Sequence, residues 1–173
     1  MEKYVPDMYQ KSIYTINYVK LLNIGIKCLL FDLDNTIVPS KSSEPPFKAK
    51  ELFISLKQKG FRVIIFTNSP KIRTKKFQNY FEVECVYNAM KPLSKNFKKV
   101  MESYHLNEDE VAIIGDQIMT DVVGGNKVGI TTILVNPLET RDFLWTIPNR
   151  IKERKIMKKL RDRDLFCKGR YYE

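Results

Sequence analysis

The chain has 173 residues, of which 43% are hydrophobic and 29% are charged, and this composition is typical of a single soluble globular domain. No apolar run approaches the roughly 20 residues that a membrane-spanning helix needs, and the three cysteines lack the close spacing of a zinc site or a disulfide framework. The net charge of +10 favours an anionic partner, and the unpaired cysteines and the absence of a signal-peptide pattern favour a cytoplasmic protein.

Apolar strands and amphipathic helices alternate along most of the chain. A helix is expected over residues 9–22. After it the pattern predicts five strands, over residues 27–32, 62–67, 83–87, 111–114 and 131–135. Between the first two strands we expect a loop over 40–46 and a helix from 49 that stops at Gly60, and after the second strand a helix with Ser69 as its N-cap and Pro70 at its first helical position. Two more helices are expected, over residues 93–104 and 118–127. This alternation predicts an α/β fold, in which a mainly parallel sheet of about five strands lies between two layers of helices.

The C-terminal segment is expected to be a basic helix over residues 147–165 with a partial apolar stripe. Residues 150–170 contain ten Lys or Arg residues and three acidic residues, so their net charge is +7, whereas the rest of the chain is close to balanced. We therefore divide the chain into a core over residues 1–140, with an N-terminal helical segment, and a basic helical tail over residues 141–173. The tail could bind lipid headgroups or nucleic acid, and it could also pack on the core.

Two carboxylates, Asp32 and Asp34, follow the strand predicted over 27–32. Side chains alternate along an extended backbone, so the two would point the same way. Two like charges held that close repel each other and raise the pKa of one carboxyl group. A bound cation or a chemical role would account for such a pair, since one carboxylate can attack phosphorus while the other moves a proton.

Three further polar groups follow later strands in the same way. Thr67 and Asn68 follow the second strand, Lys91 follows the third, and Asp116 and Asp121 follow the fourth. Thr67-Asn68 alone is also typical of a turn and Gly115-Asp116 of a helix cap, and Lys91 alone is uninformative because exposed lysines are common. Ligands of an open α/β sheet bind beyond the carboxyl ends of its strands, so the shared position of all four groups favours one phosphate and metal site.

With these residues the chain resembles the haloacid dehalogenase-like (HAD) phosphatases. The matching motifs are Asp32-Leu33-Asp34-Asn35-Thr36, Thr67, Lys91, and Gly115-Asp116 through Asp121, within residues 27–135. The chain is also similar to the class IIIA branch that contains phosphatidylglycerophosphate phosphatases. That narrower similarity includes Pro6-Asp7-Met8-Tyr9, Ser12-Ile13, Thr67-Asn68-Ser69, Lys91-Pro92, Gly115-Asp116-Gln117, Thr120-Asp121, Asn149-Arg150 and Glu153-Arg154.

The resemblance implies a HAD-like Rossmannoid three-layer sandwich and a role for each site residue. Asp32 would attack phosphorus and form an aspartyl-phosphate, while Asp34 would protonate the leaving group and then activate water. Thr67 would hold a phosphoryl oxygen with backbone support from Asn68, and Lys91 would neutralise charge. Mg²⁺ would be held by Asp32, the main-chain carbonyl of Asp34, and Asp116, while Asp121 would act through water or orient Lys91.

The spacing of the motifs predicts an enzyme without a cap domain. Between Thr36 and Arg62 there is room for one loop and one helix, and between Ser69 and Lys91 for one helix and one strand. The site should therefore be open, which suits a bulky substrate such as a lipid headgroup at a bilayer or a polymer end.

We therefore expect a cytoplasmic, Mg²⁺-dependent phosphomonoester hydrolase. By resemblance its preferred substrate is phosphatidylglycerophosphate, and its basic tail would make peripheral contact with the inner face of the membrane. One alternative is a phosphatase for another small-molecule or nucleic-acid-terminal phosphate. A second alternative, from a different class, is a basic protein that binds RNA, ribosomes or membranes.

Overall fold

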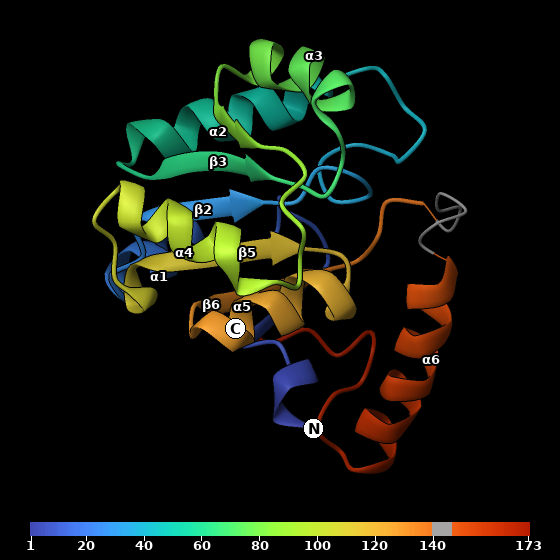
Figure 1. Ribbon diagram of the computed structural model, residues 1–173. Coiled ribbons are helices and arrows are strands. Elements are labelled where there is room, and N and C mark those ends of the chain that lie inside the picture. The colour runs from blue at the N-terminus through green and yellow to red at the C-terminus, as the bar shows by residue number, and fades with distance from the viewer. Residues whose placement is uncertain (140–146) are drawn as a thin grey trace.

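The computed structural model describes residues 1–139 and 147–173, and its centre is a six-stranded parallel sheet (Figure 1). The strands are β1 (Met8–Gln10), β2 (Cys28–Phe31), β3 (Arg62–Phe66), β4 (Glu84–Val86), β5 (Val111–Gly115) and β6 (Thr131–Val135). Their order across the sheet is β1-β6-β5-β2-β3-β4, and every neighbouring pair is parallel. The predicted α/β fold is confirmed, with six strands where about five were expected.

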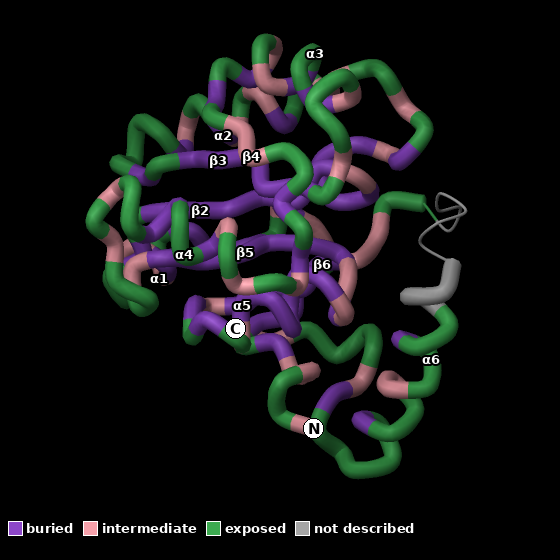
Figure 2. The backbone as a smooth tube through the Cα atoms, viewed as in Figure 1, coloured by how far each residue is buried: buried purple, intermediate pink, exposed green. Residues whose placement is uncertain are grey.

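Helices cover both faces of this sheet. They are α1 (Tyr18–Asn23), α2 (Phe47–Gln58), α3 (Lys71–Phe81), α4 (Ser94–Ser103) and α5 (Val123–Val128). The helix α6 (Ile147–Asp162) stands beside the sheet (Figure 1), and the short helical turns are η1 (Glu2–Tyr4), η2 (Glu108–Glu110) and η3 (Ile118–Val122). Alternate side chains of β2 enter two apolar cores: Leu29 and Phe31 pack with α1, α2 and α3, and Leu30 packs with α4. Figure 2 shows the buried strands running between these two layers.

The predicted helix over residues 9–22 is wrong, because the chain forms a strand there first. Tyr9 lies in β1, which is the outermost strand of the sheet and pairs with β6. The helix α1 begins only after Asn17, whose side chain accepts a hydrogen bond from the N–H of Lys20. The ring of Tyr9 is buried against Phe166, with ring centroids 5.0 Å apart. Burial against a residue more than 150 positions away overrides the local helical pattern.

The tail packs on the core. Leu160 and Phe166 are buried in a cluster with Tyr9 and Ile118, and Tyr9 and Tyr172 exchange two main-chain hydrogen bonds of 2.9 Å. The helix α6 ends at Asp162, three residues before the predicted end. The expected division between residues 140 and 141 lies outside the described residues.

The six parallel strands have their carboxyl ends on one side of the sheet, which we call the carboxyl edge. The chain between β2 and β4 is described throughout, and it contains no inserted domain that could cover this edge. The chain there forms only α2, β3, α3 and their loops, which confirms the predicted capless fold. Among the described helices none has both the length and the apolar content needed to cross a membrane.

Candidate active site

Four predicted residues meet beyond the carboxyl ends of β2, β4 and β5. Asp32, Asp116 and Asp121 place one carboxylate oxygen each within 4.8 Å of one another. The ammonium of Lys91 donates to Asp32 Oδ1 at 2.7 Å and to Asp121 Oδ1 at 2.6 Å. All four side chains are buried, although their loops are up to 89 positions apart in sequence, because parallel strands deliver them to the same edge.

Burial and the neighbouring charges shift the pKa values of Asp32 and Lys91. Burial raises the pKa of Asp32 to about 7, the Lys91 ammonium opposes that rise, and the Asp121 carboxylate adds to it. Burial alone would lower the pKa of Lys91, but Asp121 and Asp32 outweigh it and hold that pKa above its ordinary value. Among these four side chains, three carboxyl groups meet one ammonium.

A divalent cation fits this cluster by its donor chemistry. Carboxylate oxygens are hard ligands, and Mg²⁺ is commonly held by one or two of them together with water and substrate phosphate. Asp32, Asp116 and Asp121 each offer one such oxygen. The carboxylate of Asp34, which the sequence pairs with Asp32, does not join this group.

Asp121 is held in place from two sides. Its Oδ2 accepts a hydrogen bond from the N–H of Gln117 at 3.1 Å, and its Oδ1 meets Lys91. A β-carbon added at Gly115 would lie 2.2 Å from the Asp121 carboxyl carbon and 2.7 Å from its Cβ. Glycine at position 115 therefore leaves the space that Asp121 fills.

Replacing Gly115 by alanine is expected to weaken the metal site. The new methyl group must displace the short Asp121 side chain, at a cost of about 1–3 kcal/mol in the free energy of unfolding. We expect calorimetric titration to show weaker Mg²⁺ binding. The matched control is Gly125→Ala, whose methyl would meet Thr132 and Ile113 in the core. This variant should lower stability but leave Mg²⁺ affinity unchanged. Equal Mg²⁺ affinity in both variants would contradict the assignment of Asp121 to the metal site.

Asn68 acts on Lys91 through its side chain. Its Oδ1 accepts from the N–H of Lys91 at 2.7 Å, and its Nδ2 donates to the carbonyl of Lys91 at 3.0 Å. Thr67 is buried, and its hydroxyl oxygen accepts from the N–H of Ser69 at 3.1 Å, so the hydroxyl proton can donate to a phosphoryl oxygen. A contribution of Asn68 to phosphate binding would have to come from its main chain.

Asp34 lies apart from the buried cluster. Arg73 donates to Asp34 Oδ1 from Nη2 at 2.7 Å and from Nε at 3.1 Å, and the hydroxyl of Ser69 donates to Asp34 Oδ2. Arg73 also donates to the carbonyl of Ser42 at 2.6 Å and thereby ties the loop after β2 to α3. The two carboxylates therefore have different partners: Asp34 contacts Arg73 and Ser69, whereas Asp32 contacts Lys91.

The predicted N-cap role of Ser69 is wrong. The N-cap position of α3 is Pro70, which makes no side-chain cap hydrogen bond, and the Ser69 hydroxyl donates to Oδ2 of Asp34 instead. A hydrogen bond to a charged acceptor is stronger than one between neutral groups. Arg73 was not predicted as a site residue, although its position offers a signal. It lies four residues after Ser69, in the first turn of α3, which begins at the carboxyl edge of the sheet.

Two further side chains border the cluster. The hydroxyl of Thr36 lies 3.4 Å from Asp32 Oδ2 and 3.5 Å from Asp116 Oδ1. Glu153 of α6 accepts a hydrogen bond from the N–H of Ile118 at 3.2 Å, at the start of the turn that carries Asp121. The basic helix is thus joined to the loop that follows β5.

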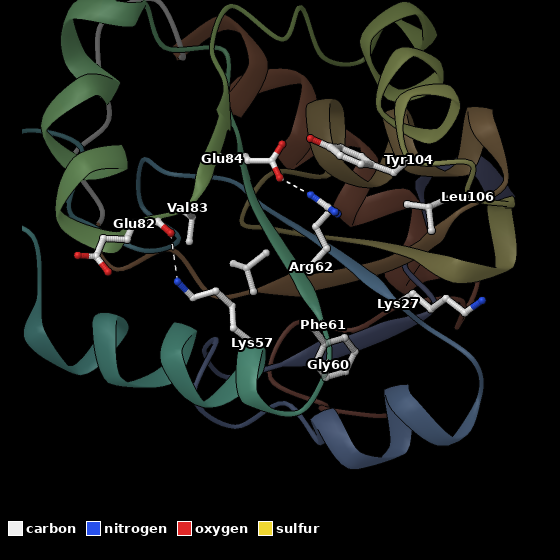
Figure 3. Close-up of a pocket in the computed structure, with 11 residues that line it drawn as sticks. Lys27, Lys57, Gly60, Phe61, Arg62, Glu82, Val83, Glu84, Tyr104 and Leu106 are labelled. Atoms are coloured by element: carbon white, nitrogen blue, oxygen red, sulfur yellow. Dashed lines mark hydrogen bonds and ion pairs between the residues drawn. The ribbon is translucent and has the colours of Figure 1, made fainter.

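A separate hollow of about 460 Å³ lies at the opposite edge of the sheet, beside the amino ends of β3 and β4 (Figure 3). Two of its cations have partners in the hollow: Arg62 pairs with the Glu84 carboxylate, and the Lys57 ammonium donates to the main-chain carbonyl of Glu82. It holds none of the predicted site residues and is not a candidate for the reaction site.

Comparisons with known proteins agree with this geometry. The family model for HAD-hydrolase-like proteins matches residues 89–141. The chain is 35% identical over 158 residues to the Probable phosphatase YqeG of Bacillus subtilis (strain 168), a match that covers 91% of this chain and 92% of that protein. It is 24% identical over 149 residues to Phosphatidylglycerophosphate phosphatase 1, chloroplastic/mitochondrial, of Arabidopsis thaliana, a match that covers 78% of this chain and 41% of that protein.

A solved structure shows the same fold. A HAD family enzyme from Bacteroides thetaiotaomicron, in complex with magnesium and inorganic phosphate, aligns with a TM-score of 0.53 at 16% identity, covering 70% of this chain and 98% of that chain. The similarity to the Bacillus protein, by contrast, extends over whole chains and does not rest on one motif. The predicted relationship is confirmed: the chain belongs to the HAD-like phosphatase family.

Proposed function

We propose that the chain is a Mg²⁺-dependent phosphomonoesterase that works through an aspartyl-phosphate on Asp32, with phosphatidylglycerophosphate as its substrate. The observation that carries the proposal is the buried ion-pair cluster, in which Lys91 contacts Asp32 and Asp121 beside Asp116. Phosphoryl transfer needs little more than such positioning and charge stabilisation.

Each residue then has a defined task. An oxygen of Asp32 forms a bond to phosphorus while the bond from phosphorus to the alcohol oxygen breaks. Lys91 and the hydroxyl of Thr67 bind the phosphoryl oxygens, and Asp32 and Asp116 would hold Mg²⁺, with the Asp34 carbonyl and Asp121 assisting. When bound, the ion supplies positive charge to the phosphoryl oxygens.

Asp34 is the proposed acid and base. It would give a proton to the departing alcohol oxygen, and would then take a proton from the water that cleaves the phosphate from Asp32. In the present arrangement its carboxylate contacts Arg73 and Ser69. Asp34 must therefore exchange at least one of these contacts for the leaving-group oxygen during turnover, which makes Arg73 a positioning residue for Asp34.

Two observations support a lipid phosphate as substrate. One relative is named as a phosphatidylglycerophosphate phosphatase, and the site edge is not covered by an inserted domain. The test is phosphate release from phosphatidylglycerophosphate in mixed micelles, set against a panel of sugar phosphates, nucleotides and 5′-phosphorylated oligonucleotides. A clear preference for one of the other phosphates would overturn the lipid assignment and leave the phosphatase reaction intact.

The exposed cations of α6 are expected to strengthen binding to anionic lipid. Because α6 packs on the core through its apolar side chains, Lys155 and Lys159 face solvent. Each Lys near an anionic surface contributes about 1 kcal/mol, so Lys155→Gln/Lys159→Gln should weaken sedimentation with phosphatidylglycerol vesicles at least about tenfold at low salt. The control removes two exposed lysines at the far end of α2, Lys57→Gln/Lys59→Gln, and equal losses in both pairs would show that net charge alone matters.

A further inference from the structure

Four large apolar side chains lie exposed beside the site, and we call them the apolar lip: Ile72, Tyr87, Met90 and Leu93. Their exposed fractions are 90%, 40%, 58% and 51%. A single exposed apolar residue is ordinary, but a group of them next to a binding site marks a surface that contacts something apolar. None of the four takes part in the ion-pair cluster.

The lip is built from two segments of the chain that lie next to each other. Residues 69–72 follow β3 and residues 87–93 follow β4, so both lie at the carboxyl edge of the sheet. The N–H of Asn88 donates to the carbonyl of Ser69 at 3.0 Å, and the ammonium of Lys71 lies 5.7 Å from the centre of the Tyr87 ring. The same two segments carry Ser69, the partner of Asp34, and Lys91, so the lip borders the site itself.

Met90 is held outward by its backbone. Its φ angle is +58°, in the left-handed region that costs a residue with a β-carbon about 1 kcal/mol or more. Its two neighbours, Ala89 and Lys91, are both buried. The turn that sends Lys91 into the site therefore sends Met90 out to solvent, and the exposure of Met90 is coupled to the placement of Lys91.

The two stretches of chain that carry the lip are basic. Two of their cations, Arg73 and Lys91, already pair with carboxylates of the site. Between residues 69 and 81, and again between 87 and 101, the chain contains no acidic residue. The basic residues of these two stretches are Lys71, Arg73, Lys75, Lys76, Lys91, Lys95, Lys98 and Lys99. Glu44 reaches one of them, Lys76, at 3.5 Å.

This combination favours an anionic bilayer over a second copy of the chain. Apolar side chains that enter the boundary between headgroups and acyl chains, flanked by Lys and Arg, are typical of proteins that lie on anionic membranes. Two copies meeting through the same lip would bring like charges together. Figure 1 also shows the basic helix α6 on the side of the molecule toward which the strands point, which is the side of the lip.

We propose that the apolar lip inserts into the surface of an anionic bilayer and sets the open site against the phosphates of the lipid headgroups. The inference rests on the proposed lipid phosphatase function and deepens it, since it assigns membrane contact to residues outside the basic tail. The lip supplies the apolar contact, and the surrounding cations supply the attraction.

The test compares the whole chain with Ile72→Ser/Leu93→Ser. Ile72 is almost fully exposed, and Leu93 occupies the N-cap position of α4, where serine is favourable, so the variant should fold. We expect about tenfold more lipid to be needed for half-maximal sedimentation with vesicles of phosphatidylglycerol and phosphatidylcholine. Hydrolysis of para-nitrophenyl phosphate should stay within about twofold of the unmodified chain.

The matched control is Val19→Ser/Ile24→Ser, which removes two half-exposed apolar side chains at α1, at the opposite edge of the sheet (Figure 1). Equal vesicle binding by the lip variant and the unmodified chain would overturn the inference. If the unmodified chain is a dimer and the lip variant is a monomer with unchanged vesicle binding, the lip contacts a second copy of the chain, and the inference is also overturned. Vesicle binding is measured without any hydrolysis, so the two proposals can fail separately. If the unmodified chain shows no Mg²⁺-dependent hydrolysis, the proposed function is contradicted, whatever the vesicle binding.

Discussion

Replacing Asp32 by asparagine is expected to abolish phosphate release, by a factor on the order of 10⁴ or more, because the proposed nucleophile is lost. Asparagine has nearly the same shape as aspartate and can keep the hydrogen bond from Lys91 at Oδ1. Burial already disfavours the charge of Asp32, whose pKa is raised to about 7. The variant should therefore keep the fold and, in the absence of metal, a melting temperature close to that of the unmodified chain.

The measurement is Mg²⁺-dependent release of phosphate from an aryl phosphate, with circular dichroism to follow unfolding. Asp109→Asn is the matched control, since Asp109 is an exposed residue of η2, remote from the cluster. Asp109→Asn should retain full activity. Substantial turnover by Asp32→Asn would remove Asp32 from the role of nucleophile and with it the proposed mechanism.

Replacing Lys91 by methionine is expected to produce the largest loss of stability. Lys91 is the cation that contacts Asp32 and Asp121, and removing one partner of a buried ion pair costs about 3–5 kcal/mol in the free energy of unfolding. Added Mg²⁺ should recover part of this loss, because a divalent ion replaces the missing positive charge. Urea unfolding with and without Mg²⁺ measures both effects.

The loss in Lys91→Met should also depend on pH. An acidic group whose pKa is raised by folding binds more protons in the folded state, so its destabilising effect is absent below its ordinary pKa of about 4 and complete above its raised pKa. For Asp32 that raised pKa is about 7 even with Lys91 present. The metal-free variant should therefore be closer in stability to the unmodified chain at pH 5 than at pH 8. Lys95→Met, at an exposed position of α4, is the control and should show neither the loss nor the pH dependence.

The parts of the fold that could be predicted were those fixed by local pattern. The apolar runs at 62–67, 111–114 and 131–135 correspond to strands within about one residue, because continuous apolar runs are typical of parallel strands buried on both faces. The gathering of Asp32, Lys91 and Asp116 followed from the same logic, since each follows a strand of one parallel sheet.

The parts that could not be predicted depend on partners distant in sequence. The strand at Met8–Gln10 has only three residues, all buried, and its environment is made by the tail, so no local period marks it. Likewise, the sequence places Asp34 at the site but does not say that Ser69 and Arg73 bind its carboxylate. The choice between partners for a polar side chain is a tertiary property.

The main-chain pairing between Tyr9 and Tyr172 bears on how this protein is made. β1 lies at the outer edge of the sheet, and its main-chain groups at Tyr9 bond to a residue that the ribosome adds more than 160 positions later. Until that residue emerges, the nascent chain displays an open β-edge, a surface that recruits strands from other molecules. A premature stop codon ahead of Phe166 would leave this edge exposed for the lifetime of the product, so truncated chains should accumulate as aggregates.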